Sequence, residues 1–395
     1  MRFRRWITSW RSLTWWFPVR NNLDSVNQLH LMLKLFGVLV YTVIDRVNYR
    51  IQGSLSDWLL LTLFTVVRCY AILDGALNGH WTILIQSDLA AVRYGMGFTV
   101  FFMMVLFTVV PFYLLIQHKR FEALLTILHE FDEEVSRYGY LRDHRYHHFR
   151  TTMYLLICLT VLTAIFAVAI SFRPESSLWN GMIFIGNFTE ICFAITLGHA
   201  ALIILIFSIH SRVQLLNQCI CEKLSQAGSY EEKRKSDLVN HMARMYDKLC
   251  DATEIISIVV CAPLFLNFIN IFFLHVISCY ACMRVLLSRA TPSEATNAML
   301  YLSWSGYFNV FVFQTIGFAS ALRQQAAKFA AAVHHCLNQP HNQSIIDRLQ
   351  QLSEQIDNRG PFITFYLFEL HPSLIIQAGG ELATYMLILI QFEMQ

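Results

Sequence analysis

The chain has 395 residues, of which 55% are hydrophobic and only 14% are charged, and its mean hydropathy is +0.45. Soluble domains carry roughly a quarter charged residues, so this composition excludes a soluble protein and indicates an all-α polytopic membrane protein. The net charge of +3 implies no nucleic-acid partner. Because the sequence has no nucleophile motif, phosphate loop or nucleotide fingerprint, we expect neither enzymatic activity nor a cofactor.

Residues 1–54 begin with a basic, aromatic stretch that lacks the apolar core and small-residue cleavage site of a signal peptide. We therefore predict an uncleaved cytosolic tail near the bilayer interface. The apolar stretch Leu29–Ile44 is short and is interrupted by Lys34 and Gly37. It predicts an amphipathic or partly inserted lead-in helix, with an additional span as the alternative.

Residues 55–320 contain six apolar stretches long enough to cross a bilayer, and a terminal helix at 375–395 contains a seventh. The predicted spans are 55–76, 90–117, 150–171, 182–208, 255–287, 300–320 and 375–393.

The placement of basic residues predicts the orientation of these seven spans. Of 30 Lys and Arg residues, 25 fall in segments 1–54, 118–150, 209–254 and 322–374, whereas two fall on the other side. The positive-inside rule therefore places the N-terminus in the cytosol, and an odd number of crossings places the C-terminus outside the plasma membrane. None of the ten cysteines lies in an outer loop, so no extracellular disulfide is expected.

The cytosolic loops 118–150 and 209–254 and the segment 321–374 show helical periodicity and predict a helical anchor below the bilayer. Apolar residues that recur at steps of three and four, or nearly so, are Leu124, Leu128, Phe131, Val135, Ile346, Leu349 and Ile356. Tyr246–Ile256 continues toward the fifth span and Arg323–Leu337 extends the sixth. Amphipathic faces that one subunit cannot bury are a natural place for subunits to meet.

The terminal helix carries polar residues around its apolar centre. Thr384 and Tyr385 precede five apolar residues, and Gln391 and Phe392 follow them. Hydrocarbon offers glutamine no hydrogen bond, so we expect Gln391 to face water or a partner. Helical spacing places Thr384, Leu387, Ile388 and Gln391 on one face.

Two interpretations of this face stay open. It lines a pore, with an apolar ring that stops ions by dewetting, or Gln391 bonds to a neighbouring helix of its own subunit. Glu381 and Glu393 bracket the helix, either as acidic rings near a pore mouth or as interfacial carboxylates.

The pattern Thr-Tyr, five hydrophobic residues, Gln-Phe resembles the motif that closes the last membrane helix of insect gustatory receptors. The segments LTILHEFDEE and HMARMYDKLCDATEIIS resemble the cytosolic segments of the same family. The resemblance implies a ligand-gated, non-selective cation channel opened by a small organic tastant, without a requirement for a G protein. It also implies a homo- or hetero-tetramer with other gustatory receptors, in which four terminal helices surround one pore.

Polar and aromatic residues at similar outer depth predict a ligand pocket. The candidate ligand-binding residues are Arg68, Asn187, Glu190, Asn270, Trp304, Tyr307 and Phe308. Arg68 is a possible partner of Glu190, and the two charges either neutralise each other or leave Glu190 available to a ligand. The stripe that contains Trp304 and Phe308 is either pocket wall or packing surface.

The alternatives to a channel are a secondary transporter and a metabotropic seven-helix receptor. A transporter requires matching broken halves, which we do not find, although Pro111 and Pro263 are possible helix breaks. A metabotropic receptor requires an extracellular N-terminus. The histidines at 144, 147 and 148 lack companion ligands at metal spacing, so no metal site is expected.

Overall fold

The computed structural model describes residues 22–39, 42–45, 50–78, 90–140, 144–171, 182–225, 232–287, 291–339, 342–365 and 368–394. Most of the predicted tail lies outside these residues. The helices are α2 (Asn22–Leu35), α3 (Leu55–Asn78), α5 (Ala90–Ile116), α6 (His118–Ser136), α7 (His144–Ser171), α9 (Met182–Ser225), α10 (Glu232–Ile256), a π-helical turn η2 (Ser257–Cys261), α11 (Ala262–Leu287), α12 (Pro292–Leu337), α13 (Gln343–Asn358) and α14 (Ser373–Met394). Two antiparallel pairs, β1 (Thr42–Asp45) with β2 (Arg50–Gln52) and β3 (Thr364–Phe365) with β4 (Phe368–Glu369), complete the fold.

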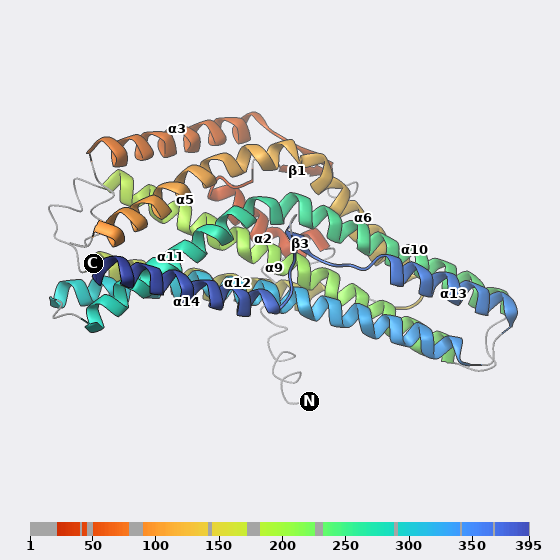
Figure 1. Ribbon diagram of the computed structural model, residues 1–395. Helices are drawn as coiled ribbons and strands as arrows, with labels where there is room; N and C mark the ends of the chain where they lie inside the picture. The colour runs from red at the N-terminus through yellow and green to blue at the C-terminus, as the bar shows by residue number, and fades with distance from the viewer. Residues whose placement is uncertain are drawn as a thin grey trace, which may run out of the picture.

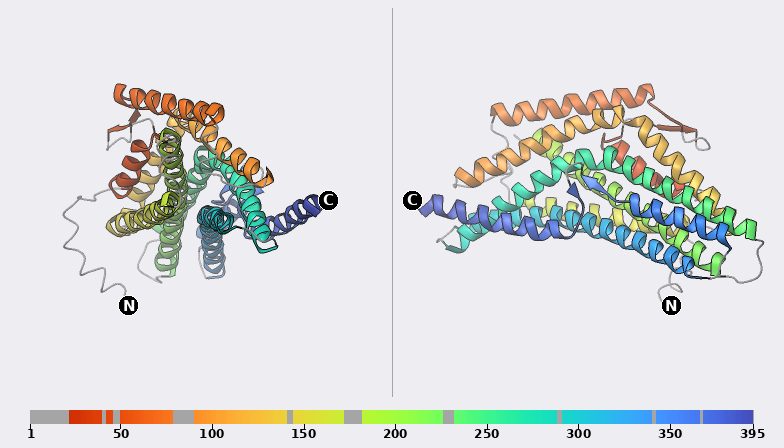
Figure 2. Two further views of the ribbon diagram at one scale, coloured as in Figure 1. Left: turned by 90° about the vertical axis from the view of Figure 1, so that its left-hand side faces the viewer. Right: turned by 45° about the vertical axis from the view of Figure 1, so that its right-hand side comes forward.

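The helices form one elongated bundle (Figure 1). Helix α3 lies along one edge, while α6, α10, α13 and the last turns of α9 and α12 extend together at the end opposite the C-terminus. The other views show α14 standing out from the side of the bundle next to α11 (Figure 2). The bundle therefore has a part that contains the membrane-length helices, here called the spanning part, and a helical extension of α6, α10, α13 and the ends of α9 and α12, here called the anchor.

Six helices in the described part of the chain are long and apolar enough to cross a membrane, which makes this a polytopic helical membrane protein. They contain the predicted spans at 55–76, 90–117, 150–171, 182–208, 255–287 and 375–393. The remaining prediction, 300–320, lies within the 46-residue helix α12, which is not among the six. Helix α12 packs along both α9 and α11, and a helix enclosed by protein needs less apolar surface than one that faces lipid.

The predicted lead-in helix at 29–44 is wrong in its second half. Helix α2 ends at Leu35, and Gly37 adopts a positive φ of 62°. A side chain at this position would meet the Phe64 ring, so glycine suits both the turn and the close approach. The chain then enters β1, and the 14 residues of α2 are too few to cross a bilayer.

Two hydrophobic cores lie along the bundle, one in the spanning part and one in the anchor. The predicted face of α6 is confirmed, because Leu124, Leu128, Phe131 and Val135 are all buried. On α13, Ile345 is buried whereas the predicted Ile346 is only partly covered. The continuous helices through α10 and α12 confirm the predicted extensions of the fifth and sixth spans.

A buried ion pair connects α3 to α9. Arg68 is 1% exposed; its Nη2 lies 2.5 Å from Glu190 Oε1 and its Nε donates to Glu190 Oε2 at 3.1 Å. The same guanidinium donates to the carbonyls of Phe107 at 2.8 Å and Phe36 at 3.0 Å. Arg68 therefore joins four segments of the chain: α3, α5, α9 and the turn after α2.

We predict that Arg68→Met, which leaves Glu190 buried without its partner, lowers the free energy of unfolding by about 3–5 kcal/mol. The double variant Arg68→Met/Glu190→Met should lose less, because it removes both charges. Unfolding of the purified protein in detergent measures the effect. Arg323→Met, which breaks an exposed pair with Glu369, is the control and should cost about 1 kcal/mol or less. Equal losses for the exposed and buried pairs would contradict the prediction.

Candidate functional site

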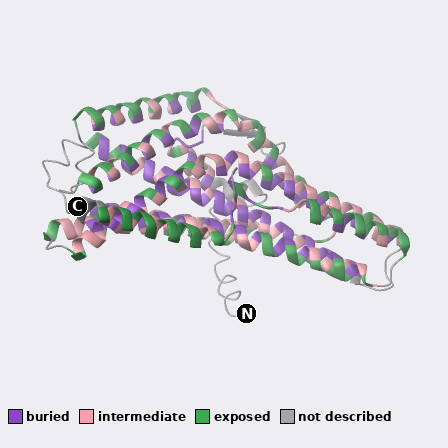
Figure 3. Cartoon of the chain, viewed as in Figure 1, coloured by how far each residue is buried: buried purple, intermediate pink, exposed green. Residues whose placement is uncertain are grey.

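Helix α14 has one packed face and one open face. Leu382, Met386 and Leu389 are partly covered, and the last two pack on the core of the spanning bundle. On the opposite side, a stripe at steps of four, three, four and three is exposed along its whole length (Figure 3). This open stripe consists of Gln377, Glu381, Thr384, Ile388 and Gln391. Leu387 is exposed beside it.

The predicted pore residues Thr384, Leu387, Ile388 and Gln391 therefore share an open surface of this subunit. The structure adds Gln377, which lies seven residues before Thr384 and which the sequence analysis did not single out. Its position seven residues before Thr384, which places both side chains on one face of the helix, was the signal in the sequence that could have identified it. Gln391 is exposed, and no hydrogen bond joins its side chain to a residue in the described part of the chain.

The exposure of α14 differs in character from that of α3, which lies at the edge of the bundle. The exposed positions of α3 are mainly large apolar side chains such as Leu59, Leu63 and Val66, as expected for a surface in contact with lipid. The open stripe of α14 contains two amides, a carboxylate and a hydroxyl. Four such polar groups on one face are costly in hydrocarbon, so this surface suits water or another subunit.

The base of α14 is attached to α10 and η2 by the segment that follows α13. Arg359 donates to Asp247 at 2.8 Å, to Asp251 at 2.6 Å and to Glu254 at 3.0 Å. These hydrogen bonds raise the pKa of Arg359 above its usual value. The Thr364 amide then donates to the Ser257 hydroxyl at 3.2 Å.

Within the spanning part, α14 is held chiefly by α11. Tyr385 of the terminal motif meets the edge of the Phe272 ring on α11, with the ring centroids 6.2 Å apart. The side chains of Phe392 and Glu393, which belong to the motif and to a predicted acidic ring, lie outside the described part. Through Tyr385, the motif thus connects the packed face of α14 to its neighbour.

Three of the predicted ligand-binding residues, Trp304, Tyr307 and Phe308, lie in an aromatic cluster between α7, α9 and α12. The Trp304 ring stacks on Phe188 with centroids 5.0 Å apart and lies 5.5 Å from Phe166. Tyr307 meets the edge of Phe308 at 5.3 Å. Trp304 and Phe308 are buried, so the aromatic stripe lies inside the bundle and does not face lipid.

Several polar groups lie in the same part of the bundle. The Tyr307 hydroxyl donates to the Cys158 carbonyl at 3.0 Å and lies 3.2 Å from the Thr196 hydroxyl. One turn further along α9, His199 bonds to Asn267 of α11 at 2.9 Å. The sequence analysis missed His199 and Asn267, although a histidine or an asparagine within a membrane span is itself a signal.

Several buried polar atoms of the spanning helices have no hydrogen-bond partner among the described residues: both side-chain polar atoms of Asn187, Nδ2 of Asn270, Nε1 of Trp304, Oδ1 of Asn267 and Nδ1 of His199. Trp304 belongs to the aromatic cluster, whereas Asn187 lies on the face of α9 that carries Phe184 and Glu190 toward α3. Such atoms usually bond to water or to a bound molecule. Three of these residues, Asn187, Asn270 and Trp304, were predicted to contact ligand.

The predicted pairing of Arg68 with Glu190 is confirmed. The guanidinium donates four hydrogen bonds, and both Glu190 oxygens accept from it. The pair therefore has a clear structural role. A direct contact of either residue with ligand stays a prediction.

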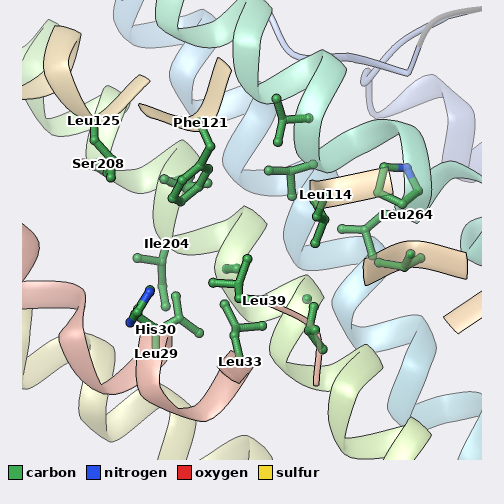
Figure 4. Close-up of a pocket in the computed structure, with 18 of the residues that line it drawn as sticks. Leu29, His30, Leu33, Leu39, Leu114, Phe121, Leu125, Ile204, Ser208 and Leu264 are labelled. Atoms are coloured by element: carbon green, nitrogen blue, oxygen red, sulfur yellow. The ribbon is translucent and has the colours of Figure 1, made fainter. Parts of the chain in front are cut away.

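A second pocket, different from the predicted one, lies between α2, α5, α6, α9 and the η2 turn (Figure 4). Its volume is about 110 Å³, and its walls are almost entirely apolar, with His30 and Ser208 as the polar side chains among the lining residues. None of the predicted ligand residues lines it. Apolar cavities of similar size bind single aromatic rings, but few polar groups are available here to fix a ligand's orientation.

Comparisons with known proteins identify the family. A model of the 7tm chemosensory receptor family matches residues 28–395. The fold is similar to that of the insect olfactory receptor OR5 from Machilis hrabei, with a TM-score of 0.66 at 13% identity over 93% of this chain and 97% of that chain. The structure of OR5 in complex with eugenol gives a TM-score of 0.60 at 12% identity, with the same coverage. A search of curated proteins finds no significant match. Because the family model spans nearly the whole chain, this protein belongs to the 7tm chemosensory receptor family.

Proposed function

We propose that this protein is a gustatory receptor that acts as a ligand-gated, non-selective cation channel in the plasma membrane. Four subunits surround a central pore, and a small organic tastant opens it. The N-terminus is cytosolic and the C-terminus extracellular, in agreement with the bias of basic residues. The terminal motif favours the gustatory type over the olfactory one.

The observation that carries the proposal is the open stripe of α14. A helix packed on one side by α11 and lined on the other by amide, hydroxyl and carboxylate groups fits a position beside a water-filled axis. Repetition of the stripe in four subunits produces rings of Gln377, Glu381, Thr384, Ile388 and Gln391. The Ile388 ring, with Leu387 beside it, closes the pore by dewetting, and the carboxylate ring at Glu381 favours cations.

The ligand site in this proposal is the aromatic cluster around Trp304, with Asn187 of α9 and Asn270 of α11 as further polar candidates. Aromatic walls supply apolar contact, and the buried polar atoms without partners supply a few directional hydrogen bonds. The OR5 complex shows a protein of this fold with eugenol, an organic molecule of suitable size and mixed polarity. A tastant opens the channel only if it binds the open state more tightly than the closed state.

A secondary transporter and a metabotropic receptor are the alternative functions. Helix α5 continues through Pro111, and Pro263 follows the π-helical turn without a break in the backbone helix. The matched broken helices of a transporter are therefore not found at either proline. A metabotropic receptor requires the opposite membrane orientation.

Gln391→Ala should alter permeation. Removal of the amide ring leaves an apolar surface at one level of the pore, so we expect the ratio of permeabilities for sodium and calcium to change by about twofold or more. Currents in oocytes, evoked by a tastant panel that includes eugenol, measure the ratio. Met386→Leu, on the packed face of α14, is the matched control and should leave the ratio unchanged. Unaltered permeation in Gln391→Ala would remove this residue from the pore.

Asn187→Leu should lower sensitivity to tastant by about tenfold without lowering thermal stability. The substitution keeps the number and branching of the side-chain heavy atoms and removes two polar atoms that have no hydrogen-bond partner among the described residues, so stability has no hydrogen bond to lose. Dose–response curves and unfolding of the same protein give the two quantities. Ala201→Leu, which narrows the apolar pocket beside α2, is the control. A larger loss of sensitivity in Ala201→Leu would place the tastant in that pocket.

Cys221 should react with a membrane-impermeant maleimide only after the cells are permeabilised. Cys221 is exposed, whereas burial raises the pKa of Cys250 to about 12 and that of Cys336 to about 11. Near neutral pH these two thiols stay protonated and unreactive, and their reactivity rises only as pH approaches those values. Cys221→Ser identifies the labelled site. Labelling of Cys221 in intact cells would contradict the proposed orientation.

A further inference from the structure

An open groove of about 350 Å³ lies where α7, α9 and α12 meet. Its lining residues are Tyr146, His147, Phe149, Arg150, Thr151, Met153, Tyr154, Ile157, Ile203, Ile204, Phe207 and Phe318. Along α7, the basic and aromatic first turns give way to apolar residues within this groove. The groove therefore crosses the depth at which a bilayer changes from headgroups to hydrocarbon.

Nitrogen-bearing side chains surround one aromatic ring at the basic end of the groove. The central guanidinium carbon of Arg150 lies 3.7 Å from the centroid of the Phe207 ring. The His147 ring lies 5.1 Å from the same centroid, and the His210 ring lies 6.2 Å from it. Lys328 of α12 acts electrostatically on His210, as Arg150 does, so positive charge from two helices reaches this end of the groove.

Among the described residues, Arg150 and Lys328 differ from other basic residues of the bundle in having no acidic partner. Arg68, Arg212 and Lys248 each pair with carboxylates. Across the described ranges, neither Arg150 nor Lys328 forms an ion pair with an aspartate or a glutamate. A local excess of positive charge is thus left at the mouth of a groove whose other end is apolar.

We propose that the groove binds one anionic phospholipid from the cytosolic leaflet. The phosphate and the acidic headgroup lie on Arg150, Lys328 and the imidazole of His210. One acyl chain follows the apolar part of the groove along Ile157 and Ile203. This inference rests on the proposed membrane orientation, but it does not depend on channel activity or on the tastant site.

Lipid fits the two ends of the groove better than a soluble anion does. A soluble phosphate uses the cations and leaves Met153, Ile157 and Phe318 without a partner. A phospholipid occupies both ends at once, and the guanidinium stacked on Phe207 stays directed toward the headgroup region by its aromatic contact. The side chains of Arg150 and Lys328 are exposed, so their replacement leaves the core of the bundle intact.

Native mass spectrometry of the purified full-length protein tests the proposal, with phosphatidylserine and phosphatidylcholine as probes. We expect phosphatidylserine to be retained more strongly than phosphatidylcholine. The double variant Arg150→Gln/Lys328→Gln should weaken phosphatidylserine binding by about tenfold or more. Ile157→Trp, which fills the apolar part but keeps every charge, should also weaken it.

Arg145→Gln is the matched control, because Arg145 is an exposed arginine on α7 that does not line the groove. It should change phosphatidylserine binding by less than about twofold. Equal retention of the two lipids, or an equal loss in Arg145→Gln and the double variant, would overturn the site. Displacement of phosphatidylserine by millimolar inorganic phosphate, together with no effect of Ile157→Trp, would show a soluble-anion site and would also overturn it. The Cys221 labelling experiment tests the orientation separately.

Discussion

The open stripe of α14 is the constraint on which the proposed mechanism depends. Hydrocarbon cannot hydrogen-bond Gln377, Glu381 or Gln391, so a single subunit in a bilayer would leave these three groups unsatisfied, whereas the Thr384 hydroxyl donates to the Gly380 carbonyl of its own helix at 3.1 Å. Within the subunit, the covered side of this helix is already used for packing against α11. In the proposed channel, water between the subunits satisfies these three groups at once, which connects the chemistry of one helix to the proposed assembly.

Helix α11 connects the proposed ligand cluster to the proposed pore. It carries Asn267, which bonds to His199 of α9 inside the bundle, and Phe272, which meets Tyr385 of α14. Below it, the η2 turn lies beside the strand that leads to α14, and the Phe268 and Phe365 rings lie 4.8 Å apart. A ligand that moves α11 therefore acts on α14 both along its length and at its base.

The sequence predicted features that depend on residues close together in the chain and, in one case, the pairing of two charges that lie far apart in it. The face of α6 and the stripe of α14 follow from helical spacing, and the pairing of Arg68 with Glu190 follows from the cost of an isolated charge in a membrane. The sequence analysis missed three features: the contacts of Phe166 and Phe188 with Trp304, the His199–Asn267 hydrogen bond and the pocket beside α2. Each depends on which distant helices pack together, and periodicity within one helix does not contain that information. The predicted span at 300–320 illustrates the same limit of sequence analysis. Helix α12 is enclosed by its neighbours, so it needs fewer apolar residues than a helix that faces lipid, and the sequence of α12 alone does not reveal this enclosure.

The lengths of the helices indicate which parts of the subunit move together during gating. Helices α9 and α12 have 44 and 46 residues, so each is about 65–70 Å long and extends well beyond the roughly 30 Å of hydrocarbon. Both helices contribute buried residues to the core of the spanning part and to the core of the anchor. Each is therefore held by packing at both of its ends. Helix α14 has only 22 residues, just enough to cross the bilayer, and Arg359 attaches its approach segment to α10. Displacement of α14 therefore disrupts fewer packed contacts than displacement of α9 or α12, which makes α14 the natural moving part of the proposed pore.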